Sequence, residues 1–335
     1  MISDFYLLIL IFLIHFALDK YKKKIFNNYF LDIPNVGRKI HKEPTYLIGG
    51  HFIFISYSVF LLFSFDHNIN HKFFFFFIFS CIFLIGILDD LKDLKPIVKL
   101  GLVLIIYLVL IHFDNDYLLE KIYFETFDKN LNFGIYSYPL SILCVLLLIN
   151  AINLIDGING LAMMVFIIIY LYLHYFLNVA FNIFIFIFYL FVCFNIYKGK
   201  YFLGNSGSLL IGALIAFSTI KAYNSKLTDN NSAEDIFILF LIPGIDMLRL
   251  FAKRIINKKN PFKADNLHLH HLLIGSISLE KVLFLYFFVI TSSSYAAFND
   301  YLPEIIIILI ITTIYFFTLL LITKKISKIR NATDK

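Results

Sequence analysis

The fold is decided by one stretch, Asn150-Ala-Ile-Asn-Leu-Ile-Asp156-Gly-Ile-Asn-Gly160. It carries one acid, three asparagines and two glycines, and it lies between two apolar runs, Ile135 to Ile149 and Leu161 to Leu177. Polar groups are costly at membrane depth or at its edge, so a polar cluster between two candidate spans is by default a functional site. The stretch therefore predicts a membrane protein and the position of its site.

The composition supports this reading. Of 335 residues, 60% are hydrophobic and only 16% are charged, whereas a soluble domain carries about 25% charged residues. The apolar runs are long enough to cross a bilayer as helices. The 3 cysteines are scattered through these runs and give neither a metal-binding spacing nor a disulfide framework. We expect an all-α, polytopic integral membrane protein, and nothing in the chain resembles a nucleic-acid module.

Eleven apolar runs predict eleven transmembrane helices within a single domain, 1–335. These cover 2–18, 46–65, 73–88, 97–113, 135–151, 161–177, 180–197, 208–222, 236–251, 282–298 and 303–323. Most of the 29 Lys and Arg residues fall on one side of this arrangement, and the side rich in basic residues is normally cytoplasmic. The N-terminus is then outside, the C-terminus is cytoplasmic, and 252–281 is a cytoplasmic loop. The net charge of +6 suits anionic lipids and anionic substrates on this inner face.

Five polar clusters all fall on the predicted cytoplasmic side. They are Arg38 to His41, Asp89 to Asp93, Asn150 to Gly160, Gly204 to Ser208, and His268 to His271. The outer loops 66–72, 114–134 and 223–235 contain no comparable pattern. This agreement, reached from hydropathy and basic residues alone, predicts one composite site on the cytoplasmic face.

The first acidic cluster ends the third predicted span. On a continuing helix, Asp93 would share a face with Asp89 and Asp90, because residues three and four apart are neighbours. Carboxylates crowded in a partly dry site repel one another and raise a pKa, which suits a general base or a Mg²⁺ site. The alternative is a solvated helix end whose acids pair with Lys92 and Lys95.

The central stretch places Asn153 and Asp156 one helical turn apart. An amide oxygen and a carboxylate at this spacing are reasonable ligands for a hard cation. Gly157 and Gly160 would let the backbone approach a ligand closely. The alternative is a capped helix start before Leu161.

Two further clusters point to anionic ligands. The glycine-rich turn Gly204 to Ser208 leads into the eighth span, and a helix N-terminus with free N–H groups is a natural phosphate cradle; the alternative is a simple cap and turn. His268, His270 and His271 lie in a basic loop, where contact with a pyrophosphate or a sugar fits better than metal binding.

Taken together, these motifs resemble the polyprenyl-phosphate N-acetylhexosamine-1-phosphate transferases of glycosyltransferase family 4, relatives of phospho-MurNAc-pentapeptide transferase. The resemblance covers roughly residues 31–275, in the family's order. It rests on Gly37 to Pro44 with Gly49-Gly50, Asp89 to Asp93 with Lys99, Asn150 to Leu161, Phe202 to Ser208, and Pro261 to Asp265 with His268 to His271. The last of these is similar to the N-acetylhexosamine branch rather than the pentapeptide branch.

The resemblance implies transfer of a HexNAc-1-phosphate, typically GlcNAc-1-phosphate, from a UDP-N-acetylhexosamine to a polyprenyl phosphate in the bilayer. The products would be polyprenyl-diphospho-sugar and UMP, at the start of cell-envelope glycan synthesis in a bacterial inner membrane. Mg²⁺, or Mn²⁺, would be the cofactor, and a homodimer is left open. The implied catalytic residues are Asp89, Asp90 and Asp156, the metal ligands are Asn153 and Asn205, and the substrate-binding residues are Asp93, Lys99, Asn150, His268, His270 and His271.

One departure from the family pattern leaves an alternative open. The family usually has an acid where this chain has Asn205, and often one at Asn159. An amide keeps an oxygen but removes a charge, so the chain could be a catalytically impaired relative that binds polyprenyl phosphate or an assembly partner. A secondary transporter is the remaining alternative, but its ionisable residues would lie near the membrane midplane with repeat symmetry.

Overall fold

The protein is a helical bundle in the computed structural model, which describes residues 2–34, 43–63, 69–225, 232–261 and 266–333. The cluster Arg38 to His41 and the segment 262–265 lie outside these ranges. The helices are α1 Ile2–Phe26, α2 Gly49–Phe63, α3 Ile69–Lys92, α4 Pro96–Phe113, α5 Ser137–Ile155, α6 Leu161–Leu177, α7 Ile183–Tyr197, α8 Gly204–Ser225, α9 Ala233–Leu239, α10 Leu241–Ile256, α11 Leu269–Ile274, α12 Leu279–Phe298 and α13 Glu304–Thr333.

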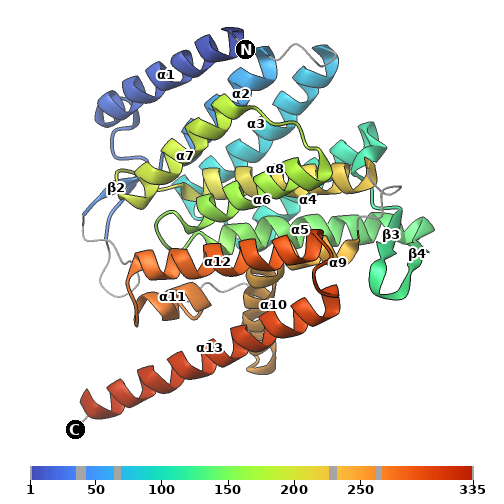
Figure 1. Ribbon diagram of the computed structural model, residues 1–335. Helices are drawn as coiled ribbons and strands as arrows, with labels where there is room; N and C mark the ends of the chain where they lie inside the picture. The colour runs from blue at the N-terminus through green and yellow to red at the C-terminus, as the bar shows by residue number, and fades with distance from the viewer. Residues whose placement is uncertain (1, 35–42, 64–68, 226–231, 262–265, 334–335) are drawn as a thin grey trace.

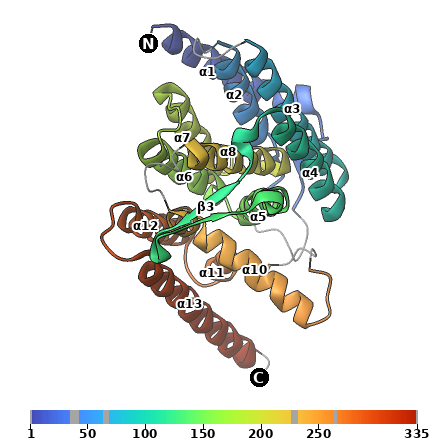
Figure 2. The same cartoon turned by 90° about the vertical axis from the view of Figure 1, so that its right-hand side faces the viewer.

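Two antiparallel ribbons and three short 3₁₀ turns complete the fold. The strands are β1 Leu31–Asp32 with β2 Thr45–Tyr46, and β3 Lys121–Phe124 with β4 Lys129–Asn132. The 3₁₀ turns are η1 Asn115–Tyr117, η2 Glu125–Phe127 and η3 Gly134–Tyr136. Figure 2 shows the β3–β4 hairpin running across one end of the bundle. We call this the hairpin end, and the opposite end, with β2 and α11 in Figure 1, the motif end.

Helix α8 is the centre of the bundle. It packs against α2, α3, α5 and α6 (Figure 1), and 83% of the residues in its most apolar stretch of 18 are buried inside the bundle. Small residues allow this packing: a Cβ on Gly212 would lie 3.2 Å from the Ile149 Cα, and one on Gly207 would lie 2.9 Å from the Gly50 Cα. Small residues at helix contacts are the usual way in which membrane helices approach closely.

In the part of the chain that the structure describes, six helical segments are long and apolar enough to cross a membrane. They are Ile69–Lys92, Pro96–Phe113, Gly134–Ile155, Gly204–Ser225, Leu279–Phe298 and Glu304–Lys325, and the shorter apolar helices α2, α6 and α7 pack among them. The expectation of an all-α membrane protein thus matches the helical architecture. The number of eleven spans and their orientation stay predictions.

The segment 236–251 differs from the single span expected there. The chain forms α9 and α10 instead, with a break at Phe240. Pro243 has no N–H group and is tolerated in the first turn of a helix but not in its interior, so a helix that contains it has to begin just before it. The same break gives α10 its own direction, steeply inclined to α12 in Figure 1.

Candidate active site

Asp90 joins α3 to the start of α8. Its two carboxylate oxygens accept hydrogen bonds from the backbone N–H groups of Asn205, at 2.7 Å, and Ser206, at 3.0 Å. The two helices can approach this closely because Gly86 has no side chain; a Cβ there would lie 2.3 Å from the Ser206 Cα. The free N–H groups predicted to hold a phosphate are therefore occupied at residues 205 and 206 by an internal carboxylate, which the positive helix N-terminus stabilises.

Asp89 faces a different set of partners. It is buried, and its carboxylate accepts from the Leu94 N–H and from the Lys99 Nζ, each at 2.9 Å. The ion pair is made with Lys99 of α4, and neither Lys92 nor Lys95 takes this place. The structure thus brings together the acid and the basic residue that the resemblance had singled out.

The expected placement of Asp93 is wrong. Helix α3 ends at Lys92, and Asp93 has a left-handed backbone with φ of +53°, so the helix does not continue through it. Its exposed side chain does not share a helical face with Asp89 and Asp90. The turn at this point lets the chain reverse into Pro96, where α4 begins.

The central stretch forms the end of α5 and the turn into α6. The Asn153 Oδ1 accepts a hydrogen bond from the Ser208 Oγ at 2.8 Å, which ties this stretch to the glycine-rich start of α8. Asp156 follows α5 directly, and burial raises its pKa to about 8, with a further contribution from the negative charge of Asp90. Asn150 lies further back and contacts the Met247 Sδ of α10 at 3.2 Å.

The segment His268 to His271, which we call the histidine loop, lies over the turn between α5 and α6. A Cβ on Gly157 would lie 2.4 Å from the His270 Nε2 and 2.5 Å from the His271 Nε2, so both imidazoles rest on the bare Gly157 backbone. His270 is 1% exposed, and neither of its ring nitrogens has a hydrogen-bond partner in the described part of the chain. Burial lowers the pKa of His270 well below its usual value, which keeps the ring neutral.

These contacts link four of the five predicted clusters. Asp90 meets Asn205, Asn153 meets Ser208, and Gly157 meets His270, all at the motif end of the bundle (Figure 1). The fifth cluster lies outside the described residues, although Gly50, which follows it, touches the start of α8. The contacts thus connect the Asp90 carboxylate, the backbone of Asn205, the Asn153 amide and the two imidazoles beside Gly157.

The comparisons with known proteins show the family of the chain. A family model described as glycosyl transferase family 4 matches residues 72–223. The undecaprenyl-phosphate alpha-N-acetylglucosaminyl 1-phosphate transferase of Thermotoga maritima is 31% identical over 255 residues, which cover 76% of each chain. The protein of the same name from Escherichia coli K12 is 27% identical over 260 residues, covering 73% of this chain and 69% of the relative. The chain belongs to glycosyl transferase family 4. The resemblance seen in the motifs is therefore confirmed.

Sequence analysis did not predict one polar centre of this family 4 protein, which forms around Asp246 of α10. Its carboxylate accepts from the His268 ring at 2.7 Å, from the Tyr315 hydroxyl at 2.6 Å and from the Arg249 guanidinium at 2.9 Å. It also accepts from the Leu269 N–H at 3.1 Å, and so holds the base of the histidine loop. The signal was an acid inside the apolar run 236–251, which we had taken as a plain span.

One group of acids lies far from the family 4 motifs. Among the described residues, the His, Cys, Asp and Glu side chains close enough to share one ion are Glu125, Asp300 and Glu304, at the hairpin end. Burial and neighbouring acids raise the pKa of Glu125 to about 7. Glu125 lies in the loop 114–134, where sequence analysis saw no comparable pattern, and Glu304 begins α13 inside the predicted span 303–323. The cluster is separate from the predicted ligands Asn153 and Asn205.

Proposed function

We propose that the protein transfers GlcNAc-1-phosphate from UDP-GlcNAc to undecaprenyl phosphate and releases UMP. The relatives carry the name of this reaction. The observation that carries the proposal is the set of contacts of Asp90 with Asn205, of Asn153 with Ser208 and of Gly157 with His270, which joins four family motifs at one end of the bundle. On this reading, the Asn205 departure is tolerated.

In the proposed reaction, an oxygen of the lipid phosphate attacks the β-phosphorus of the UDP-sugar. A new phosphorus–oxygen bond forms, the bond between the two phosphates of the nucleotide breaks, and UMP leaves. Asp156 is the best-placed group to hold the proton of the lipid phosphate, because its pKa of about 8 lets it exchange a proton near neutral pH. Lys99, held in place by Asp89, would contact the diphosphate.

The other predicted residues take supporting roles in this proposal. Asp90 positions Asn205 by capping α8 rather than acting as a free base, since both of its oxygens already accept N–H groups. Neutral His270, with two ring nitrogens uncommitted in the described chain, would accept or donate hydrogen bonds to the nucleotide-sugar beside His268 and His271. Asn150 and Asp93 are kept as outer substrate contacts.

The residues present also fit a hard divalent cation, Mg²⁺ or Mn²⁺. The Asn153 and Asn205 amide oxygens and the Asp156 carboxylate are the donor type that Mg²⁺ prefers. Burial raises the pKa of Asp156, with a smaller contribution from the negative charge of Asp90, and a cation beside these two acids would compensate that charge. The ion would supply charge neutralisation on the diphosphate.

We further propose that the motif end faces the cytoplasm of a bacterial inner membrane. The basic residues of 249–281 and 324–335 support this orientation, together with the family's need for a nucleotide-sugar. The chain would act as one multi-pass domain, with 252–281 as the loop that closes over the substrate.

The test is UMP release by purified protein given undecaprenyl phosphate, Mg²⁺ and a panel of UDP-HexNAc donors. We expect release with UDP-GlcNAc, and a loss of at least 100-fold in Asp89→Asn and in Asp156→Asn, with both variants still folded in detergent. Asp116→Asn, an exposed acid at the hairpin end, is the matched control and should keep wild-type turnover.

Two results would contradict this proposal. The activity is wrong if no donor gives UMP under conditions in which the Escherichia coli relative is active. The assigned roles are wrong if Asp156→Asn turns over at the wild-type rate. A protein that binds undecaprenyl phosphate without turnover would instead support the impaired relative that Asn205 suggests.

A further inference from the structure

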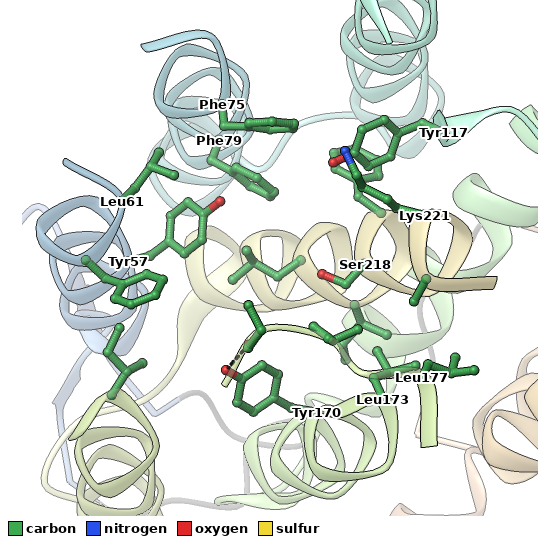
Figure 3. A pocket seen from close by; sticks show the side chains of 18 of the residues that line it. Tyr57, Leu61, Phe75, Phe79, Tyr117, Tyr170, Leu173, Leu177, Ser218 and Lys221 are labelled. Atoms are coloured by element: carbon green, nitrogen blue, oxygen red, sulfur yellow. Dashed lines mark hydrogen bonds between the residues drawn. The ribbon is translucent and has the colours of Figure 1, made fainter. Parts of the chain in front are cut away.

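A large cavity lies at the hairpin end, away from the candidate site. Its volume is about 430 Å³, and it is enclosed by α2, α3, α6, α7 and α8 (Figure 3). Ser218 of α8 lines it, whereas Ser208 on the same helix belongs to the candidate site. Ten residues of α-helix separate the two, a rise of roughly 15 Å, so the cavity is a separate feature of the molecule.

The wall of the cavity is mainly hydrocarbon and aromatic. Phe75, Phe79, Leu173 and Leu177 supply much of it, and Figure 3 shows the Ser218 hydroxyl directed into the space. The Tyr57 hydroxyl also faces it, and neither hydroxyl has a hydrogen bond in the described part of the chain. The lining thus offers an apolar body with separate polar points, which include Tyr170 and Asn178 besides these two hydroxyls.

The rim of the cavity is charged. Lys221 is neutralised there by Asp114 at 3.2 Å and Asp116 at 3.5 Å, and it lies over the Tyr117 ring. Lys72 also lines the rim, and no ion pair joins it to another described residue. Lys72 is therefore the cation available to an anionic group at the mouth of the cavity.

The contents of such a cavity follow from the surroundings of the protein. An apolar cavity left empty destabilises a fold in proportion to its volume. Water needs two to four polar partners at each position, and the part of the wall made by Phe75, Phe79, Leu173 and Leu177 offers none. The volume is within the range of sites that hold ligands, about 300–1,000 Å³. In a bundle whose α3 and α8 can cross a membrane, hydrocarbon chains are the most abundant apolar molecules nearby.

We infer that this cavity binds one acyl chain of a membrane phospholipid, with the phosphate of the headgroup beside Lys72. The apolar wall takes the chain, and the Tyr57 and Ser218 hydroxyls are placed to meet the ester oxygens or ordered water beside it. The inference does not depend on the transferase reaction, because every residue in it lies at the hairpin end.

The experiment uses the full-length protein in nanodiscs of phosphatidylglycerol that carries a diazirine in one acyl chain. After irradiation, peptide mass spectrometry should find adducts on residues of the wall such as Phe79 and Leu173. Ser218→Phe places a ring in the cavity and should lower these adducts at least tenfold. Leu309→Phe, at a residue of α13 that is 60% exposed, is the matched control and should leave them unchanged. Gel filtration and thermal unfolding check that each variant is folded.

A second arm tests the headgroup. Lys72→Gln should reduce labelling by the phosphatidylglycerol probe several-fold, and should not change labelling by diacylglycerol that carries the same chain. Equal labelling of folded Ser218→Phe and wild type would overturn the inference, as would adducts confined to bilayer-facing side chains. Displacement of the probe by equimolar undecaprenyl phosphate would also overturn it, because the occupant would then be the carrier lipid. Loss of the diacylglycerol signal in Lys72→Gln would overturn the assigned role of the phosphate.

Discussion

Removing the Asp246 carboxylate should release the histidine loop from the bundle. This buried acid holds four donors: the His268 ring, the Leu269 N–H, the Arg249 guanidinium and the Tyr315 hydroxyl. They come from α10, from the start of α11 and from α13, and Asp246 is the common acceptor for all four. The position of the loop over Gly157 therefore depends on one side chain that does not itself touch Gly157.

The size of the effect can be worked from these contacts. Asp246→Ala leaves Arg249, whose side chain is 13% exposed, without its carboxylate, and breaking a buried pair by removing one partner costs about 3–5 kcal/mol. For a chain of this length this corresponds to a drop in unfolding temperature of roughly 4–7 °C. Displacement of His270 by about 1 Å should lower UMP release about 100-fold. Asp246→Asn keeps the shape and one acceptor oxygen, so its loss of stability should be about 1.5–3 kcal/mol.

Thermal unfolding in detergent and UMP release under saturating donor are the two assays. Tyr315→Phe is the graded control, because it removes one donor of the four, together with the acceptor of the Arg249 Nε–H at 2.7 Å. It should cost about 1.5–3 kcal/mol, less than the loss of the carboxylate. The reasoning is refuted if Asp246→Ala unfolds at the wild-type temperature, or if it releases UMP at the wild-type rate. Equal losses in Asp246→Ala and Tyr315→Phe would likewise show that the carboxylate is not the centre of the network.

Three further perturbations probe other contacts. Gly157→Ala puts a Cβ 2.4 Å from the His270 Nε2, so UMP release should fall at least tenfold. Gly101→Ala, where a Cβ would have no atom within 4 Å, is the control and should keep full activity. Equal UMP release by the two variants would contradict the packing of His270 on Gly157. Glu125 has a pKa raised to about 7, so its ionisation destabilises the fold. The unfolding temperature of the wild type should therefore fall as the pH rises from 5 to 8, and that of Glu125→Gln should fall less. If both proteins show the same dependence of unfolding temperature on pH, Glu125 is not the group responsible. Asn205→Asp should lower the Mg²⁺ concentration needed for half-maximal UMP release, and an unchanged Mg²⁺ dependence would remove residue 205 from the ligand set.

Much of the helical layout could be predicted because apolar runs and their breaks are local signals. The span predicted at 161–177 coincides with α6, since Gly160 with φ of +84° and Asn178 with φ of +54° bound the run on both sides. The segment 236–251 could not be predicted in this way. Hydropathy is averaged over a window of residues, so neither Pro243 nor the acidic Asp246 changed the prediction of a single span.

The residues of the candidate site could be predicted from the sequence better than the residues that contact them. Grouping the motifs by membrane side placed Asp90, Asn205, Asp156 and His270 together. The Asp90 carboxylate accepts from the Asn205 N–H, and Gly157, next to Asp156, contacts His270. The partners of Asp246 could not be found, because Tyr315 lies 69 residues further along the chain. The acids Glu125 and Asp300 are likewise distant in sequence and meet only through the packing of the hairpin end.

The capping of α8 by Asp90 changes how this site can hold a diphosphate. A helix N-terminus with free N–H groups would serve as an anion site by itself, but at residues 205 and 206 these groups already bind a carboxylate. The partial positive charge of the helix is thus used to hold α3 against α8, and a substrate cannot use the same donors without displacing Asp90. Neutralisation of the diphosphate then has to come from side chains around the cap, above all Lys99, and from any cation held by the neighbouring amides. Asp89 and Asp90 are adjacent in sequence, yet Asp89 forms an ion pair with Lys99 and Asp90 caps α8. Their roles should therefore be separable by mutation.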